Sequence, residues 1–122
     1  MMARAVKRYE RASPLKVRKI LREIKGKPIP QARAILNFYH SRTKIPVLKT
    51  LNSAVANLKN QVGSIRVEDK DLFVKEAVAN DGPQMKRLRP GFRGSPAIIR
   101  KRTCHITIVV DSYKPIPTKK GE

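Results

Sequence analysis

The stretch from Asp81 to Arg102 reads DGPQMKRLRPGFRGSPAIIRKR and lies between two strand-like segments, 72–80 and 103–110. A connection of this length is far longer than an ordinary hairpin loop and does not belong in a compact domain. The simplest explanation is that the two strands continue beyond the body as a β-hairpin arm. Pro90–Gly91 suits a type II turn at its tip, and Gly94 adds conformational freedom. With about ten residues on each side at roughly 3.3 Å per residue, the arm reaches about 30 Å.

The arm carries a dense excess of positive charge. Between Gln84 and Cys104 there are seven basic residues and no acidic one. Like charges at this density oppose a free two-stranded ribbon, which is marginally stable even when neutral. We therefore expect the arm to be mobile alone and to be ordered by the phosphates of a polyanionic partner. Apolar residues such as Met85, Leu88 and Phe92 lie between the cations, which favours packing against bases or a shaped wall over a disordered basic loop.

The segments that flank the arm are predicted strands. In the second of them, alternate apolar residues share one face and predict a half-buried strand: Cys104, Ile106, Ile108 and Val110. Cys104 is then a small core residue. The segment 72–80 is a plausible strand, although its two faces are not cleanly divided into apolar and polar. A weaker candidate over 3–10 gives three strands in all.

Three segments have the apolar periodicity of helices. The first begins at Ser13–Pro14, an N-cap followed by proline at the first helical position, and stops at Gly26. A shorter helix after Pro30 ends near His40–Ser41, and the longest begins at Pro46 and runs to Gly63. The predicted core faces consist of Val17, Ile20, Leu21 and Ile24; Ala32, Ile35, Leu36 and Tyr39; and Val47, Leu51, Ala54, Val55, Leu58 and Val62.

The chain as a whole is short and strongly basic. Its 122 residues correspond to one domain, which we place at 1–112 with the arm included, followed by a flexible basic tail, 113–122, that contains prolines. With 28 Lys and Arg against 9 Asp and Glu, the formal net charge is +19 at pH 7. Such a chain repels copies of itself and attracts a polyanion. We therefore expect no homo-oligomer.

Several function classes lack the residues that they need. No segment has the uncharged apolar length of a membrane-spanning helix, and no signal-peptide core follows the first residues. A single cysteine forms no internal disulfide, and two histidines give no zinc-site spacing, so we expect no cofactor, no metal and a reducing setting. His40 and His105 lack an evident catalytic partner. The acidic cluster at 68–71 fits a solvated turn, offset by nearby cations, better than a magnesium site. We therefore expect no enzyme.

Duplex nucleic acid and folded RNA remain the two classes of partner. Aromatic residues are only 5% of the chain, and no strand carries the aromatic pair on which single-stranded bases stack. A membrane surface is disfavoured because no helix has a spare apolar face with a cationic rim. Recognition is therefore expected through phosphates and shape. An arm with a proline at its tip also fits an architectural DNA-binding protein, which wedges such residues between base steps.

Five strings along the chain resemble one known family. They are SPLKVR (13–18), KGK (25–27), SAVAN (53–57), DGPQMKR (81–87) and KRTCHIT (101–107). In this order and spacing, from about residue 3 to residue 110, they resemble the bacterial-type large-subunit ribosomal protein twenty-two. The resemblance implies an α+β fold, in which three helices pack on a three-stranded antiparallel sheet from which a long β-hairpin arm projects.

The resemblance also implies a function. The family is a structural constituent of the large ribosomal subunit, whose body binds 23S-type rRNA near the mouth of the peptide exit tunnel. Its hairpin lines the tunnel wall, and the protein takes part in subunit assembly. The implied partners are large-subunit rRNA, neighbouring ribosomal proteins and, at the hairpin tip, the nascent peptide. The implied location is a cytoplasmic ribosome, with an organellar ribosome as the alternative.

Candidate contacts follow from the resemblance together with the basic face of the first helix. The predicted rRNA-binding residues are Lys16, Arg18, Lys19, Arg22, Lys25, Lys27, Ser53, Asn57, Lys86, Arg87, Arg89, Arg93, Arg100, Lys101 and Arg102. The predicted tunnel-facing tip consists of Pro90, Gly91, Phe92, Arg93 and Gly94. The tip departs from the family pattern, because Ser95–Pro96 stands where Arg–Ala is common and Phe92 adds bulk.

Overall fold

A computed structural model describes residues 2–62 and 68–113. The helices are α1 (Pro14–Ile24), α2 (Ile29–Phe38) and α3 (Lys44–Val62), with a short 3₁₀ turn at Asp69–Asp71 and a turn with left-handed residues at Phe92–Gly94. The strands are β1 (Met2–Glu10), β2 (Leu72–Asp81), β3 (Met85–Pro90), β4 (Pro96–Lys101) and β5 (Cys104–Ser112). Most of the predicted tail lies outside the described residues; its first residue, Tyr113, stacks on Phe73 with ring centroids 4.7 Å apart.

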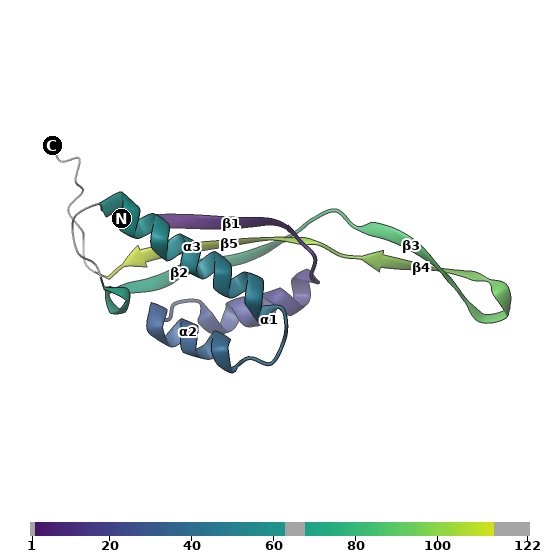
Figure 1. The fold of residues 1–122 in the computed structure, drawn as a ribbon, viewed down its shortest axis with the longest axis horizontal. Coiled ribbons are helices and arrows are strands. Elements are labelled where there is room, and N and C mark those ends of the chain that lie inside the picture. Colours follow the sequence, from purple (N-terminus) through teal and green to yellow (C-terminus); the bar gives the residue numbers. More distant parts are fainter. Residues whose placement is uncertain (1, 63–67, 114–122) are drawn as a thin grey trace.

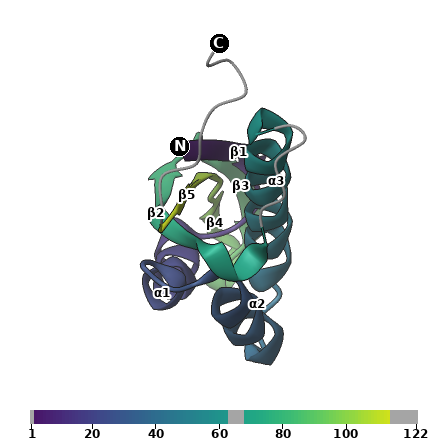
Figure 2. The same cartoon turned by 90° about the vertical axis from the view of Figure 1, so that its left-hand side faces the viewer.

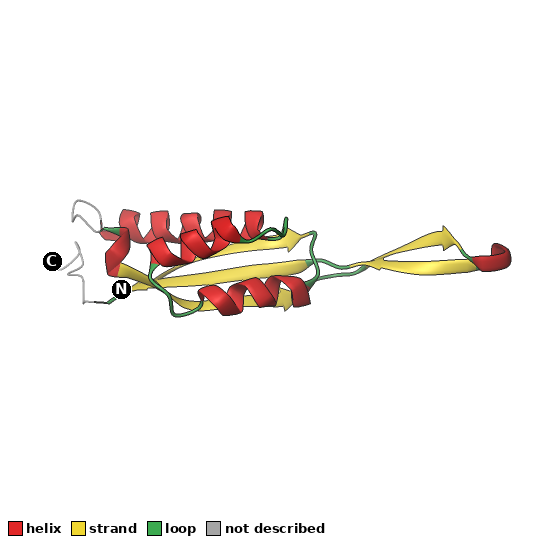
Figure 3. Cartoon of the chain, turned by 90° about the horizontal axis from the view of Figure 1, so that it is seen from below, coloured by secondary structure: helices red, strands yellow, loops and turns green. Residues whose placement is uncertain are grey.

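The body is a three-stranded antiparallel sheet covered by helices. The strand order is β1–β5–β2, so β5, the last of the described strands, lies in the centre. The helices lie over one face of this sheet (Figure 1, Figure 3), with α3 packed along β1 and β5 and α1 packed on β2. The end-on view shows the same arrangement down the length of the body (Figure 2). The predicted α+β class is confirmed.

The arm is a separate two-stranded sheet. Strands β3 and β4 pair antiparallel, with Met85 opposite Lys101 at the base and Pro90 opposite Pro96 near the tip. They extend away from the body beyond the end of the sheet at which β2 finishes and β5 begins (Figure 1). Every residue of β3 is exposed. The projecting arm predicted from the long connection is therefore confirmed.

The core matches the predicted apolar faces closely. All four predicted core residues of α1 are buried, as are those of β5, including the free thiol of Cys104. On α2, Ala32 and Leu36 are buried, whereas Ile35 and Tyr39 pack only partly against the core. Helix α2 ends at Phe38, earlier than expected. Helix α3 begins at Lys44 rather than at the proline, because proline is tolerated within the first helical turn.

A β-bulge explains why β2 had no clean pair of faces in the sequence. The register shifts between Val74 and Glu76, which oppose consecutive residues of β5, so Lys75 is the extra residue. Before the bulge the buried side chains are Leu72 and Val74, at even positions, and after it the buried side chain is Ala79, at an odd position. The alternation of apolar and polar residues therefore cannot be followed across the bulge.

The turn at the arm tip differs from the prediction. The type II turn expected at Pro90–Gly91 is wrong, because the positive φ angles of the tip lie at Arg93 (55°) and Gly94 (77°). The Gly91 N–H donates to the carbonyl oxygen of Ser95 at 2.6 Å, which closes a loop of residues 91–95. A Cβ on Gly91 would lie 2.2 Å from that same oxygen, so the position requires glycine for close approach rather than for a left-handed φ.

Candidate nucleic-acid interface

Basic residues from distant parts of the chain meet where the arm joins the body. They line a concavity of about 560 Å³, which we call the arm-root cavity. Its lining residues are Arg11, Ala12, Ser13, Lys16, Thr43, Ile99, Arg100, Lys101 and Arg102. Five of these nine are cationic, and none of them is acidic. The fold thus brings the predicted contact Lys16 together with three predicted contacts at the base of the arm.

The start of α1 adds a further attraction for anions at this cavity. Ser13 occupies the predicted N-cap position, but its hydroxyl makes no capping hydrogen bond. Pro14 occupies the first helical turn, and no acidic residue lies in that turn. Because Ser13 and Lys16 line the cavity, the first N–H groups and the positive end of the helix dipole lie beside the same cations. This geometry suits a phosphate group.

Sequence reasoning missed three polar residues of the arm-root cavity. Arg11 and Ser13 flank the predicted helix start, so a cation beside a helix N-terminus was the available signal. Thr43 offered no such signal, because its approach depends on how the loop between α2 and α3 lies against the arm. Its hydroxyl oxygen lies 2.7 Å from that of Ser41.

A second basic surface follows the groove between α1 and β2. Three predicted contacts, Arg18, Arg22 and Lys25, line this groove, which has a volume of about 270 Å³. Arg18 is partly committed within the protein: its Nε donates to the Ala79 carbonyl oxygen at 3.0 Å, and its guanidinium lies 3.5 Å from an Asp81 carboxylate oxygen. Arg22 and Lys25 are exposed, and so are the predicted contacts Lys19 and Lys27 nearby in the chain.

The two predicted contacts on α3 stand apart from both basic concavities. Ser53 and Asn57 are exposed but line neither one. The Asn57 amide donates to the Arg4 carbonyl oxygen at 3.0 Å, which ties α3 to β1. This bond gives Asn57 a role in the fold itself.

The arm presents two faces of different composition. On one face Lys86 lies directly opposite Arg100, and Leu88 lies opposite Ile98. Leu88 is 76% exposed and Ile98 is 62% exposed, so this apolar pair has no cover within the described protein. The other face pairs the predicted contacts Arg87 and Arg89 with small or apolar residues of β4. Like charges facing each other across a ribbon destabilise it until counter-charges arrive.

The acidic turn before β2 is an ion-pair cluster rather than a metal site. Asp69 pairs with Arg33 and with Lys59, whose Nζ lies 2.7 Å from Oδ1. The Lys59 ammonium, with Arg33 beside it, lowers the pKa of Asp69 against the opposing effect of burial. The predicted solvated turn is thus wrong for Asp69, which is partly buried, whereas Glu68 is offset by Lys70 at 3.2 Å as expected. Within residues 2–62 and 68–113, no group of His, Cys, Asp and Glu residues could hold a metal ion.

His105, which the sequence left without a catalytic partner, has a structural role. Tyr9 adopts a left-handed φ of 57° at an irregularity of β1, and its N–H donates to His105 Nδ1 at 3.1 Å. The two rings meet edge to face with centroids 4.9 Å apart. The accepting nitrogen of His105, Nδ1, is therefore occupied by a backbone hydrogen bond and is not available to take a proton from a substrate.

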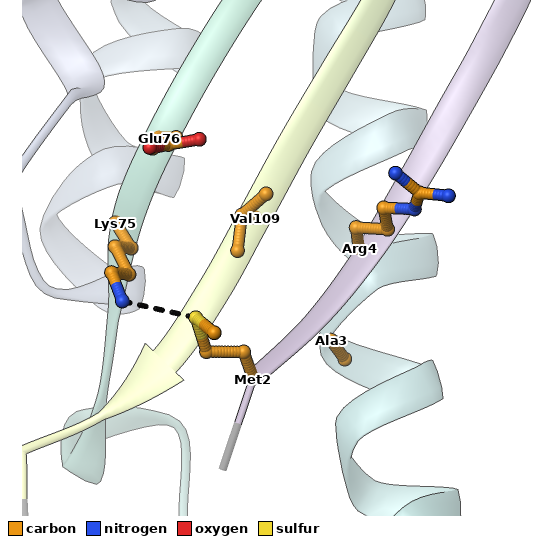
Figure 4. Close-up of a pocket in the computed structure, with 6 residues that line it drawn as sticks. All are labelled: Met2, Ala3, Arg4, Lys75, Glu76 and Val109. Carbon is orange, nitrogen blue, oxygen red and sulfur yellow. Dashed lines mark hydrogen bonds between the residues drawn. The ribbon is translucent and has the colours of Figure 1, made fainter.

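A pocket on the sheet offers a contrasting surface of mixed charge (Figure 4). Arg4, Val109 and Glu76 lie in one row across the three strands, and the Lys75 Nζ lies 3.0 Å from the Met2 sulfur. Since a carboxylate lines this pocket of about 320 Å³, it fits phosphate less well than the arm-root cavity. None of the described helices is long and apolar enough to cross a membrane.

A small α+β body with a projecting basic hairpin and convergent cations defines a nucleic-acid-associated structural protein. The chain belongs to the ribosomal protein L22p/L17e family, whose model matches residues 5–111. It is 49% identical over 110 residues to the large ribosomal subunit protein uL22 of Thermoanaerobacter sp. (strain X514) and to that of Thermoanaerobacter pseudethanolicus (strain ATCC 33223 / 39E). Each alignment covers 90% of this chain and 96% of the relative.

Family membership confirms the resemblance seen in the five sequence strings. The chain is a bacterial-type protein of the large ribosomal subunit, and the family is structural rather than enzymatic. As a protein of the large ribosomal subunit, it has the ribosome as its location.

Proposed function

We propose that this protein binds large-subunit rRNA by neutralising phosphates along a continuous path from the α1–β2 groove, through the arm-root cavity, to the arm. The observation that carries the proposal is the arm-root cavity, where cations from two distant segments, 11–16 and 100–102, converge beside a helix N-terminus. A folded RNA offers closely spaced phosphates of different strands, which such a cavity matches better than it matches an extended single strand.

The arm extends this binding into a confined space. Both of its faces are exposed, and its cations, including the opposed pair Lys86 and Arg100, need counter-charges. We infer that the body lies near the mouth of the peptide exit tunnel of a cytoplasmic ribosome and that the arm runs along the tunnel wall. RNA phosphates would then order the arm, and the tip at 90–94 would face the nascent peptide. By bridging RNA segments that contact body and arm, the protein would assist subunit assembly.

Titration of binding against salt tests the rRNA proposal. Lys16→Ala and Arg102→Ala should each weaken binding to purified 23S-type rRNA and reduce the slope of log affinity against log salt by about 1. Lys49→Ala, an exposed lysine of α3 outside both basic concavities, is the matched control and should leave the slope unchanged. Equal slopes for all three variants would contradict the proposed site.

Competition with duplex DNA separates rRNA binding from an architectural DNA role. An architectural protein would bind any duplex with comparable affinity and form a stable dimer. The proposal instead expects the chain to migrate with large subunits on a sucrose gradient through a high-salt wash, since weak electrostatic adsorption is stripped under those conditions. Release from subunits with recovery on DNA would overturn it.

A further inference from the structure

One face of the body differs from the rest of this cationic protein. Helix α2, with the sequence IPQARAILNF, contains a single charged residue, Arg33. Two of its three guanidinium nitrogens are engaged: Nε donates to Asn52 Oδ1 at 3.0 Å, and Nη1 pairs with Asp69. The outer surface of α2 therefore offers no free cation to a phosphate.

This surface contains an apolar groove between α1 and α2. The groove has a volume of about 330 Å³ and is lined by Glu23, Gln31, Ala34, Ile35, Phe38 and Tyr39. Phe38 is 86% exposed, compared with 76% for Leu88 on the arm. A phenylalanine ring left this far in water is a strong driving force for association. We call this feature the α2 groove.

The charge at the α2 groove has the opposite sign to the basic surfaces. Glu23 of α1 lines the groove, and its carboxylate takes part in none of the ion pairs found among residues 2–62 and 68–113. A carboxylate beside an apolar wall repels an RNA phosphate and attracts an ammonium or guanidinium group. A second copy of the chain is disfavoured as occupant because two chains of charge +19 repel each other.

We propose that the α2 groove docks a segment of a neighbouring large-subunit protein that presents an apolar anchor and a Lys or Arg. The anchor would fill the space beside Ile35 and Phe38, and the cation would pair with Glu23, where a guanidinium can also stack on the Phe38 ring. Proteins that share an RNA-rich particle carry such cations in excess, so the chemistry of the groove and that of the neighbour match. This surface goes beyond the proposed rRNA contacts and lies apart from them.

Site-specific photo-cross-linking in assembled subunits tests the inference. The chain carries p-benzoylphenylalanine in place of Phe38, is incorporated into large subunits, purified on a gradient and irradiated. We expect a covalent adduct with one ribosomal protein, mapped by mass spectrometry to a peptide with an apolar residue next to Lys or Arg. Glu23→Lys should lower the adduct yield at least about fivefold, since an ion pair is replaced by repulsion. Glu23→Gln should give an intermediate loss, and Glu76→Lys on the sheet is the matched charge-reversal control.

The outcomes separate this inference from the proposed function. Co-migration with subunits reports rRNA binding, so its loss in the parent chain would strike the proposed function. Normal incorporation with adducts to rRNA, adducts to a second copy of the chain, or no adduct at all would overturn the docking proposal alone. An adduct yield that is equal in Glu23→Lys and Glu76→Lys would also overturn the docking proposal.

Discussion

The backbone N–H of Gly82 donates a 2.9 Å hydrogen bond to the carbonyl oxygen of Thr103 at the point where the two sheets meet. The Thr103 hydroxyl donates in turn to the Pro83 carbonyl oxygen at 2.6 Å, and Thr103 is only 6% exposed. A Cβ on Gly82 would lie 2.5 Å from Thr103 Oγ1. These contacts form a neck that fixes where the arm leaves the body.

Changes at the neck should destabilise the junction. Thr103→Val removes the hydroxyl donor and leaves the Pro83 carbonyl without it, which should cost about 1 kcal/mol of unfolding free energy. Gly82→Ala forces the Thr103 side chain to move and should cost a similar amount. Urea unfolding measures both, with Thr103→Ser as the control that keeps the hydroxyl. Wild-type stability of Thr103→Val would show that the neck is not held by this bond.

Arg18 should behave differently from Lys16, although both are predicted rRNA contacts. Arg18→Ala loses the hydrogen bond to the Ala79 carbonyl and the contact with Asp81, so it should lower the free energy of unfolding by about 1 kcal/mol. It should also weaken RNA binding. Lys16→Ala should lower affinity only, because Lys16 is exposed. Thermal melts alongside rRNA binding separate the two effects. Identical melts for the two variants would count against the internal role of Arg18.

The ion pairs of Asp69 with Arg33 and Lys59 should make the free energy of unfolding depend on pH. The folded-state pKa of Asp69 is lowered below its ordinary value of 3.8, so its contribution is complete at pH 7 and is lost as pH falls below about 4. Asp69→Asn should cost about 1 kcal/mol at pH 7 and progressively less in acid. Denaturant unfolding at several pH values checks this, with the exposed Asp71→Asn as control. A deficit for Asp69→Asn that stays constant into acid would refute the linkage.

Most of the body could be predicted because its signals are local. Ser13–Pro14 and Gly26 bound α1 in the sequence, and Gly26 does adopt a positive φ of 79° just after the helix. The alternation around Ile106 and Ile108 fixed the inner face of β5. The extra residue Lys75 defeated the same reasoning on β2, since a bulge exchanges the two faces without leaving a local sequence signal.

The candidate site was less predictable because it depends on contacts between distant segments. The charge of the arm was visible in the sequence, but the meeting of Arg11 and Thr43 with Arg102 follows from how the body and arm pack. The prediction of the tip turn was wrong for a related reason. Pro90–Gly91 is a strong turn signal, but the hydrogen bond from Gly91 to Ser95 closes a longer loop, in which Arg93 and Gly94 are the left-handed residues.

Cys104 should be unreactive until the protein unfolds. Its side chain is fully buried, and burial, with the nearby Glu10 carboxylate, raises the pKa of the thiol. The thiolate is the reactive species, so both effects slow attack on a disulfide reagent. Labelling at pH 8 should be slow in buffer and rapid in concentrated denaturant. Rapid labelling of the native protein would show that the central strand opens easily.

Removing the arm tip should leave the body intact. Deletion of 90–94 takes away only loop and strand-end residues that have no part in the core of the body. The variant should keep the thermal midpoint of the wild type and should still bind rRNA through the body. Circular dichroism and rRNA binding measure these two properties. Loss of the folded body would refute an arm that projects independently.

The strand order β1–β5–β2 constrains when this protein can fold. The last strand to be synthesised lies between the first strand and β2, so β1 has no neighbour to pair with until residue 112 has been made. Until then the apolar faces of α1 and α3 have no complete sheet to cover, and the newborn chain exposes them together with nearly all of its charge. Folding of the body therefore waits for the synthesis of β5, and a truncated product that lacks β5 has no route to the native body.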